Sequence, residues 1–277
     1  MSILASCEFF LLVDFSGIVG LVLLNSSTGR YYKIPYPPSY RSGTEYYGMY
    51  LDDANNDYKV VRIQNVITNM EVMVYSLRTN KWRLIERTVE KCYAWCSVVI
   101  GHLLHIVFAL TYTKSKRRIG CFDMLAEKWT TDVPMPEINV NKSIKLGVLD
   151  GLLCIITVDS TWVMKEYGVK DSWFILMNIP YDDIYYDIWE WPNITPIAFR
   201  KGSQDEVLLC SRYRNSKLEY IWYNVREKKA TKATLNGVLP NTTYYGYICK
   251  GSLVDFPGGR NMKLHHPKQA EETTTSS

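Results

Sequence analysis

Four potential metal ligands lie close together in the stretch CYAWCSVVIGHLLH: Cys92, Cys96, His102 and His105. Thiolates and imidazoles are the usual ligands of zinc, so a stretch with two of each must be considered as a metal site. The spacing fits no common zinc pattern, and His102 falls in a predicted turn whereas His105 falls in a predicted strand. We therefore expect no metal here. We also expect no cofactor, because the chain has no glycine-rich phosphate loop and no Gly-x-Ser-x-Gly motif.

Paired carboxylates are the second chemistry to consider, since propeller glycosidases place them on inner strands around a central funnel. If this chain folds as a propeller, the strands that we predict to line its centre are EYYGMY, SVVI, KLGVL, PIAFR and TYYGYI. Their only carboxylate is Glu45, at a strand end. One carboxylate cannot fill both roles that hydrolysis needs, so we expect no enzyme. A propeller-fold carbohydrate-active enzyme is the alternative, and it predicts carboxylates that converge in the funnel.

Side chains suited to protein recognition are abundant, with 21 tyrosines and 8 tryptophans. The basic cluster at 114–118 could be a nuclear address or a phosphate contact, but a solvated loop is the simpler reading. The segment Tyr181–Trp191 mixes aromatic and acidic residues, and it could either clasp a basic peptide or cover the edge of a sheet. The net charge of +4 is mild, so we expect neither nucleic acid nor a membrane as partner.

The elements that must position these residues are hairpins that recur along the chain. In each hairpin an apolar residue precedes a second one by seven positions, or by nine in one copy: Leu24 and Tyr31, Tyr75 and Trp82, Phe122 and Trp129, Met164 and Trp173, Tyr223 and Ala230. The first members lie 51, 47, 42 and 59 residues apart. A repeat of about 40–50 residues built from hairpins is typical of propeller blades. The sequence therefore predicts an all-β, kelch-like β-propeller of five to six four-stranded blades.

The two ends of the chain suggest how the ring closes. The first unit has only three recognisable strands, Cys7–Asp14, Val19–Asn25 and Arg30–Ile34. Two further strands, Thr243–Ile248 and Ser252–Phe256, have no hairpin to complete. We expect these C-terminal strands to close the propeller, either by supplying the missing strand of the first blade or by beginning a sixth.

The domain organisation follows from these strands. We expect a single propeller-like domain over residues 7–256, an N-terminal remnant of residues 1–6, and a disordered tail over 257–277 that ends in PKQAEETTTSS. The apolar N-terminal stretch contains Glu8 and Asp14 and has no basic start, so it does not read as a signal peptide. We therefore expect a cytoplasmic or nuclear location.

Long connections are predicted on one face of such a propeller, and short turns on the other. The long ones are Pro35–Thr44, Leu110–Arg118, Asp132–Ser143 and Tyr181–Thr195. Irregular loops on a rigid scaffold commonly carry binding sites. The predicted partner-binding residues are Tyr36, Tyr40, Arg41, Tyr112, Arg117, Tyr185, Tyr186, Trp189, Arg212 and Arg214. Charge reversal at Arg117 or Arg214 is expected to weaken partner binding without lowering the melting temperature.

The hairpins also carry a family resemblance. NDYKVVRI, EVMVYSLRTNKWRLIE, FDMLAEKW, LGVLDGLLCII and WVMKEYGVKDSW resemble segments of the F-box-associated interaction domain of plant F-box proteins, a group that includes F-box/kelch-like and S-locus F-box-like members. The opening VLLNSSTGRYYKIP is similar to another family segment, with Ser26 where the family usually has proline. The resemblance extends from about Cys7 to Phe256.

The resemblance implies a protein-binding module that recognises the target of an SCF-type ubiquitin ligase. The identity of the target protein is not implied. In such proteins an N-terminal F-box binds the Skp adaptor, which links it to the cullin, but only six residues precede Cys7 here. We therefore expect the Skp adaptor and the cullin as partners only if an F-box is supplied. A truncated F-box-like protein without ligase function is a further alternative.

Overall fold

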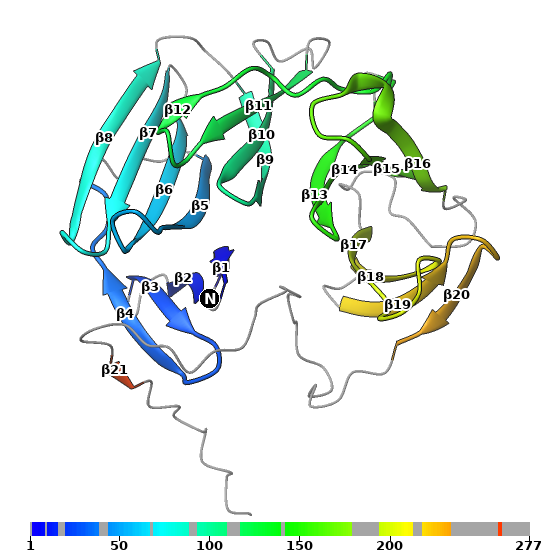
Figure 1. Ribbon diagram of the computed structural model, residues 1–277, viewed down its shortest axis with the longest axis horizontal. Coiled ribbons are helices and arrows are strands. Elements are labelled where there is room, and N and C mark those ends of the chain that lie inside the picture. The colour runs from blue at the N-terminus through cyan, green and yellow to red at the C-terminus, as the bar shows by residue number, and fades with distance from the viewer. Residues whose placement is uncertain are drawn as a thin grey trace, which may run out of the picture.

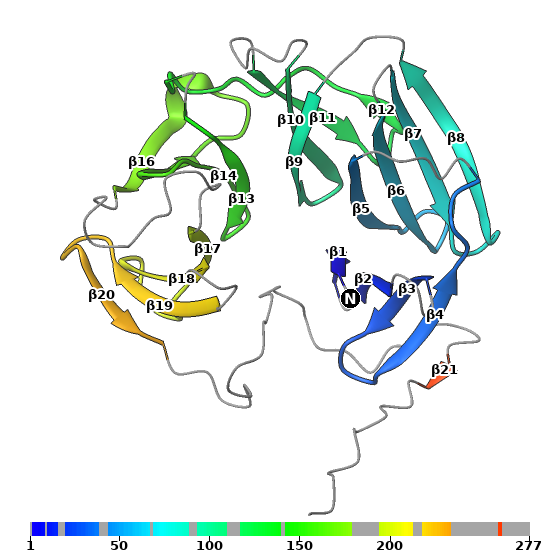
Figure 2. The same cartoon turned by 180° about the vertical axis from the view of Figure 1, so that it is seen from behind.

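The chain forms a five-bladed β-propeller, with the blades arranged around a central axis (Figures 1 and 2). The computed structural model describes residues 2–8, 10–15, 20–38, 44–66, 69–88, 93–109, 117–139, 142–178, 194–212, 218–233 and 260–261. The prediction of an all-β propeller with four-stranded blades is confirmed, and the number of blades is five.

Each blade is an antiparallel meander whose strands run from the centre outward. Blade 1 contains β1 (Ser2–Cys7), β2 (Phe10–Phe15), β3 (Gly20–Asn25) and β4 (Arg30–Ile34), and blade 2 contains β5 (Thr44–Asp52), β6 (Asp57–Val66), β7 (Asn69–Ser76) and β8 (Lys81–Thr88). Blade 3 contains β9 (Tyr93–Ile100), β10 (Leu103–Ala109), β11 (Arg117–Asp123) and β12 (Lys128–Trp129). Blade 4 contains β13 (Lys145–Leu149), β14 (Leu152–Ile156), β15 (Ser160–Met164) and β16 (Trp173–Asn178), and blade 5 contains β17 (Ile194–Phe199), β18 (Glu206–Arg212), β19 (Leu218–Asn224) and β20 (Lys229–Lys232).

The hairpins predicted from the repeat join the third and fourth strands of each blade. The two members of every repeated pair lie directly opposite each other: Leu24 and Tyr31, Tyr75 and Trp82, Phe122 and Trp129, Met164 and Trp173, and Tyr223 and Ala230. Directly opposed side chains on one sheet face are in contact, and aromatic pairs stabilise the sheet. The spacing in the sequence therefore reflects the cross-strand register of the outer hairpin.

The first blade corrects one expectation. We predicted three strands for it, with residues 1–6 as a remnant, but Ser2–Cys7 forms the inner strand β1, which pairs with β2. The two strands are separated at Glu8, which has a positive φ of 48°. Positive φ is usually found at glycine or asparagine and only rarely at glutamate. Because Glu8 is neither glycine nor asparagine, nothing in the sequence marks a turn here, and β1 and β2 read as one apolar run.

The C-terminal part of the chain is described over two residues. Arg260 and Asn261 form β21, which pairs antiparallel with Tyr31 and Arg30 on the outer edge of β4. These two residues fall within the segment expected to be a disordered tail. The predicted strands at 243–248 and 252–256 lie outside the described residues, so closure of the ring by them stays a prediction.

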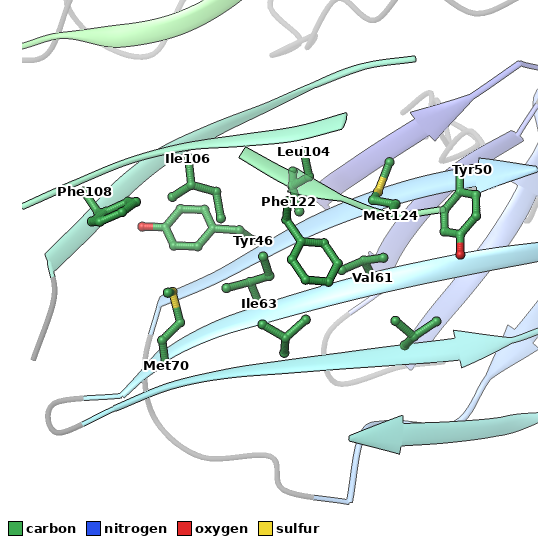
Figure 3. Packing of buried hydrophobic residues seen from close by; sticks show 12 residues of the cluster. Tyr46, Tyr50, Val61, Ile63, Met70, Leu104, Ile106, Phe108, Phe122 and Met124 are labelled. Carbon is green, nitrogen blue, oxygen red and sulfur yellow. The ribbon is translucent and has the colours of Figure 1, made fainter. Parts of the chain in front are cut away.

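Hydrophobic clusters fill the spaces between neighbouring blades. Between blades 2 and 3, Tyr46 and Leu104 belong to one such cluster (Figure 3). A Cβ on Gly48 of β5 would lie 2.6 Å from the Sδ of Met124, so glycine allows these blades to approach closely. The other clusters join blades 1 and 2, blades 3 and 4, and blades 4 and 5. In the described part of the chain no such cluster joins blade 5 to blade 1.

Candidate partner-binding surface

The order of strands within a blade determines which connections share a face. The turns after the first and third strands lie on one face, here called the short-turn face. The connections after the second strand and the links between blades lie on the opposite face, the long-loop face. Of its connections, the structure describes residues 35–38, 130–139, 142–144 and 157–159.

Most of the predicted partner-binding residues lie outside the described residues: Tyr40, Arg41, Tyr112, Tyr185, Tyr186, Trp189 and Arg214. Arg212 is the last residue of β18, and its side chain is not described. Tyr36 and Arg117 are the two whose side chains can be placed. They lie at different blade junctions, and their surroundings differ.

Tyr36 lies in the link between blades 1 and 2 and is 45% exposed. Its hydroxyl donates a hydrogen bond to Oδ1 of Asp14, with an O–O distance of 3.2 Å. Its ring lies over Gly20, where an added Cβ would be 3.1 Å from the ring. The preceding residue, Pro35, accepts a hydrogen bond through its carbonyl oxygen from the indole N–H of Trp82 at 2.7 Å. Tyr36 is thus an aromatic side chain held in place with nearly half of its surface exposed, which suits protein recognition.

Arg117, in contrast, is turned toward the protein's own backbone. Its guanidinium donates to the carbonyl oxygens of Lys142 and of Asn139, the latter at 3.0 Å. Burial lowers the pKa of Arg117 below its ordinary value. The side chain therefore anchors the link between blades 3 and 4. This corrects the expectation for charge reversal at Arg117, because a carboxylate facing two carbonyl oxygens would destabilise the fold.

Further polar contacts attach the same link to blade 4. The Nζ of Lys142 lies 2.5 Å from Oδ2 of Asp159, and the hydroxyl of Thr157 donates to Oδ1 of Asp159 at 2.8 Å. Burial alone would raise the pKa of Asp159, but the hydrogen bonds from Lys142 and Thr157 together with the positive charge of Lys142 hold the pKa below its ordinary value. Lys142, in the link between blades 3 and 4, is therefore held by Arg117 of blade 3 and by Asp159 of blade 4.

A buried ion network lies in blade 2, and sequence reasoning missed most of it. Arg62 is fully buried on β6, and it donates to Glu45 from Nε at 3.0 Å and also from Nη2. Its Nη1 lies 4.0 Å from Oε1 of Glu71, which in turn accepts two hydrogen bonds from Arg87. Tyr47 donates to the second oxygen of Glu45 at 2.8 Å. The only sequence signal is a set of charged residues inside strands that are otherwise apolar.

The geometry of this network does not match the carboxylate pair of a glycosidase. Glu45 is on the inner strand β5, but Glu71 is on the third strand, β7, away from the central axis (Figure 1). Each carboxylate is already engaged by an arginine, so neither is placed to protonate a leaving group. The two charges instead offset the buried guanidinium between them.

The three potential metal ligands that the structure describes, Cys96, His102 and His105, each have their own separate surroundings. His102 is in a turn, with its Nε2 3.9 Å from Asp123, while His105 is fully buried and its Nε2 lies 2.7 Å from the hydroxyl of Tyr167. Burial raises the pKa of Cys96 to about 12, and Cys92 lies outside the described residues. Over the described ranges, no group of three or more His, Cys, Asp or Glu residues could hold a metal ion.

The described chain contains one helical element, η1 (Lys170–Ser172), in the turn before β16. No helix in the described ranges therefore has the length or apolar character needed to span a membrane.

The protein family that matches this chain agrees with the fold. The family of F-box associated beta propeller domains matches residues 1–255. F-box protein CPR1 of Arabidopsis thaliana is 27% identical over 93% of this chain and 71% of its own length. F-box protein At4g22390 of the same species is 24% identical over 87% of this chain and 67% of its own. A chain of a solved nidogen/laminin complex covers 83% of this chain, with 78% of its own length, at 10% identity and a TM-score of 0.45.

The chain therefore belongs to the F-box associated beta propeller domain family. The resemblance to plant F-box-associated domains seen in the sequence is confirmed.

Proposed function

We propose that this chain is the target-recognition domain of a plant F-box protein, and that it binds a target protein non-covalently through the long-loop face. The observation that carries the proposal is the family match over residues 1–255, which includes all five blades. The two relatives above are named F-box proteins, which supports an association with SCF-type ubiquitin ligases. The chemistry of ubiquitin transfer would belong to other subunits.

The proposed mechanism is recognition by exposed aromatic and basic side chains on a rigid scaffold. Tyr36 illustrates it, because Asp14 and Gly20 of blade 1 hold the side chain in place while 45% of its surface stays exposed. Ordering costs at an interface fall when the contacting side chains are already held in place. Aromatic and arginine anchors commonly dominate such interfaces. The other candidate anchors are Tyr40, Arg41, Tyr112, Tyr185, Tyr186, Trp189, Arg212 and Arg214.

The first experiment is affinity purification of the tagged chain from plant cells, with partners scored by mass spectrometry. A test variant combines Tyr185→Ala, Tyr186→Ala and Trp189→Ala in the long-loop segment. A control variant carries Leu125→Ala, at a side chain 49% exposed in a turn on the short-turn face. We expect the test variant to lose at least tenfold of an enriched target protein, and the control to keep it. Equal binding by both variants would exclude this segment as the recognition site.

The same purification tests the link to the ligase. We expect the Skp adaptor and the cullin to be absent when this chain is used alone, and to co-purify when an F-box is fused to its N-terminus. Recovery of the adaptor with this chain alone would contradict the expectation that adaptor binding requires an added F-box. Failure of the fused protein to recover it would remove ligase membership from the proposal while leaving target binding to stand separately.

A further inference from the structure

The outer edges of the blades differ in how they are protected. An edge strand exposes unpaired backbone N–H and C=O groups, and proteins usually blunt such edges with charges, short strands or a covering segment. On blade 1, β21 covers part of β4. On blade 3, β12 has only two residues. The outer strands of blades 2 and 5 carry charged side chains: Lys81, Arg83, Glu86 and Arg87 on β8, and Lys229 and Lys232 on β20.

The outer strand of blade 4 has none of these protections. β16 reads Trp-Phe-Ile-Leu-Met-Asn, so it is six residues long and carries no charge. It pairs with β15 on its inner side, and among the described residues no strand pairs with its outer side (Figure 1). Phe174 and Ile175 are 41% and 42% exposed. An uncharged and exposed edge of this kind is a template for pairing with another strand.

The exposed side chains lie on both faces of this edge. Phe174 lies opposite the buried Val163, and Ile175 lies opposite Trp162. Successive residues of a strand point to opposite faces, so the apolar surface wraps around the edge. An additional strand beside β16 would form backbone hydrogen bonds and cover apolar side chains on each face at once.

We propose that β16 is a homodimer interface, at which a second copy of this chain pairs its own β16 antiparallel to the first. Antiparallel pairing of identical strands satisfies two-fold symmetry, the commonest symmetry of soluble homo-oligomers. Because β16 has no charged residue, self-pairing places no like charges opposite each other, whereas self-pairing of β20 would bring lysines together. The adjoining turn is balanced in charge, with Lys165, Glu166, Lys170 and Asp171. The pairing of β21 with β4 illustrates that an outer edge of this propeller accepts an antiparallel neighbour.

The test is the oligomeric state of the purified 277-residue chain, measured by sedimentation equilibrium from low to high micromolar concentration. Ile175→Lys and Phe174→Lys place a charge on the edge, and each is expected to raise the dimer dissociation constant at least tenfold. Leu84→Lys is the matched control, because Leu84 is 47% exposed on the outer strand β8. We expect the control to dimerise like the wild type, and all variants to keep a similar melting temperature as monomers.

Hydrogen exchange gives a second readout that needs no substitution. Backbone amides of residues 173–178 should become protected as the protein concentration rises, while those of β8 and β20 should not change. A wild-type chain that is monomeric throughout the range would overturn the proposal. So would a dimer that survives both substitutions in β16 without concentration-dependent protection there. Neither result would affect target binding through the long-loop face.

Discussion

The indole N–H of Trp82 donates a hydrogen bond to the carbonyl oxygen of Pro35, with 2.7 Å between the two atoms. Trp173 does the same to Pro134, at 2.8 Å. In both cases the tryptophan is near the start of a blade's outer strand, and the proline lies in the link that leaves the preceding blade. The repeated tryptophan therefore ties one blade to the chain of its neighbour, in addition to packing against its cross-strand partner.

Trp173→Phe should lower the free energy of unfolding by about 1 kcal/mol more than Trp129→Phe does. Both substitutions remove a similar ring volume. Trp173 loses a hydrogen bond, whereas the buried Nε1 of Trp129 has no hydrogen-bond partner within the described structure. Removing an unpartnered buried N–H is close to neutral or favourable. Urea unfolding of the two variants measures the difference, and equal losses would mean that the bond to Pro134 contributes nothing.

The repeat that revealed the propeller is local, which explains why it could be predicted from the sequence. Tyr75 and Trp82 are seven residues apart and directly opposed, so turn length and register are encoded together. Asp150 and Gly151 behave likewise: both have positive φ, as a two-residue hairpin turn requires. Local turn chemistry thus encodes these hairpins, whereas the turn between β1 and β2 at Glu8 carries no such signal.

The candidate site was less predictable, because its contacts join residues far apart in the sequence. Arg117 has a partner 25 positions away at Lys142, and nothing in either residue's type specifies that contact. Arg62 was missed for the same reason, since Glu45 is 17 positions away on another strand. Such contacts depend on how strands and links are arranged in space, and composition alone does not encode that arrangement.

Arg117→Ala should destabilise the protein by about 2 kcal/mol, because the substitution removes charged donors from two carbonyl oxygens. Arg226→Ala is the control. Arg226 forms one ion pair with Asp205 at 3.2 Å, and its side chain is 80% exposed. Exposed pairs of this kind contribute about 0–1 kcal/mol. Thermal and urea unfolding of both variants test the prediction. Equal stability of the two variants would mean that Arg117 behaves as an exposed surface residue, as the sequence analysis predicted.

Arg62→Met should destabilise the protein by about 3–5 kcal/mol, because it leaves two carboxylates near each other without the buried guanidinium between them. Adding Glu45→Gln and Glu71→Gln to the same variant should recover a substantial part of the loss. The recovery separates the electrostatic cause from the change in packing. If the triple variant is no more stable than Arg62→Met, the network acts through shape alone. Urea unfolding at neutral pH provides the comparison.

The stability of the junction between blades 3 and 4 should depend on pH through His105. Burial lowers the pKa of His105 from 6.5 to about 4, and its Nε2 is paired with the hydroxyl of Tyr167. Well above pH 6.5 the side chain is neutral in both the folded and the unfolded state and contributes no pH dependence. Between pH 6.5 and 4 the unfolded chain binds a proton that the folded chain does not, so stability falls with falling pH. The loss should approach about 3 kcal/mol near pH 4.

His105→Gln removes the titrating group while retaining an amide that can bond to the hydroxyl of Tyr167. We expect the variant to be somewhat less stable at pH 8, because the smaller side chain packs less well in a fully buried position. Between pH 6.5 and 4, however, its free energy of unfolding should fall less steeply than that of the wild type, by about 1.4 kcal/mol per pH unit at most. The other three histidines and the carboxylates are common to both proteins, so the difference between the two curves isolates His105. Parallel curves would mean that His105 is protonated in the folded state as readily as in the unfolded one, and that burial at this junction does not exclude the charge.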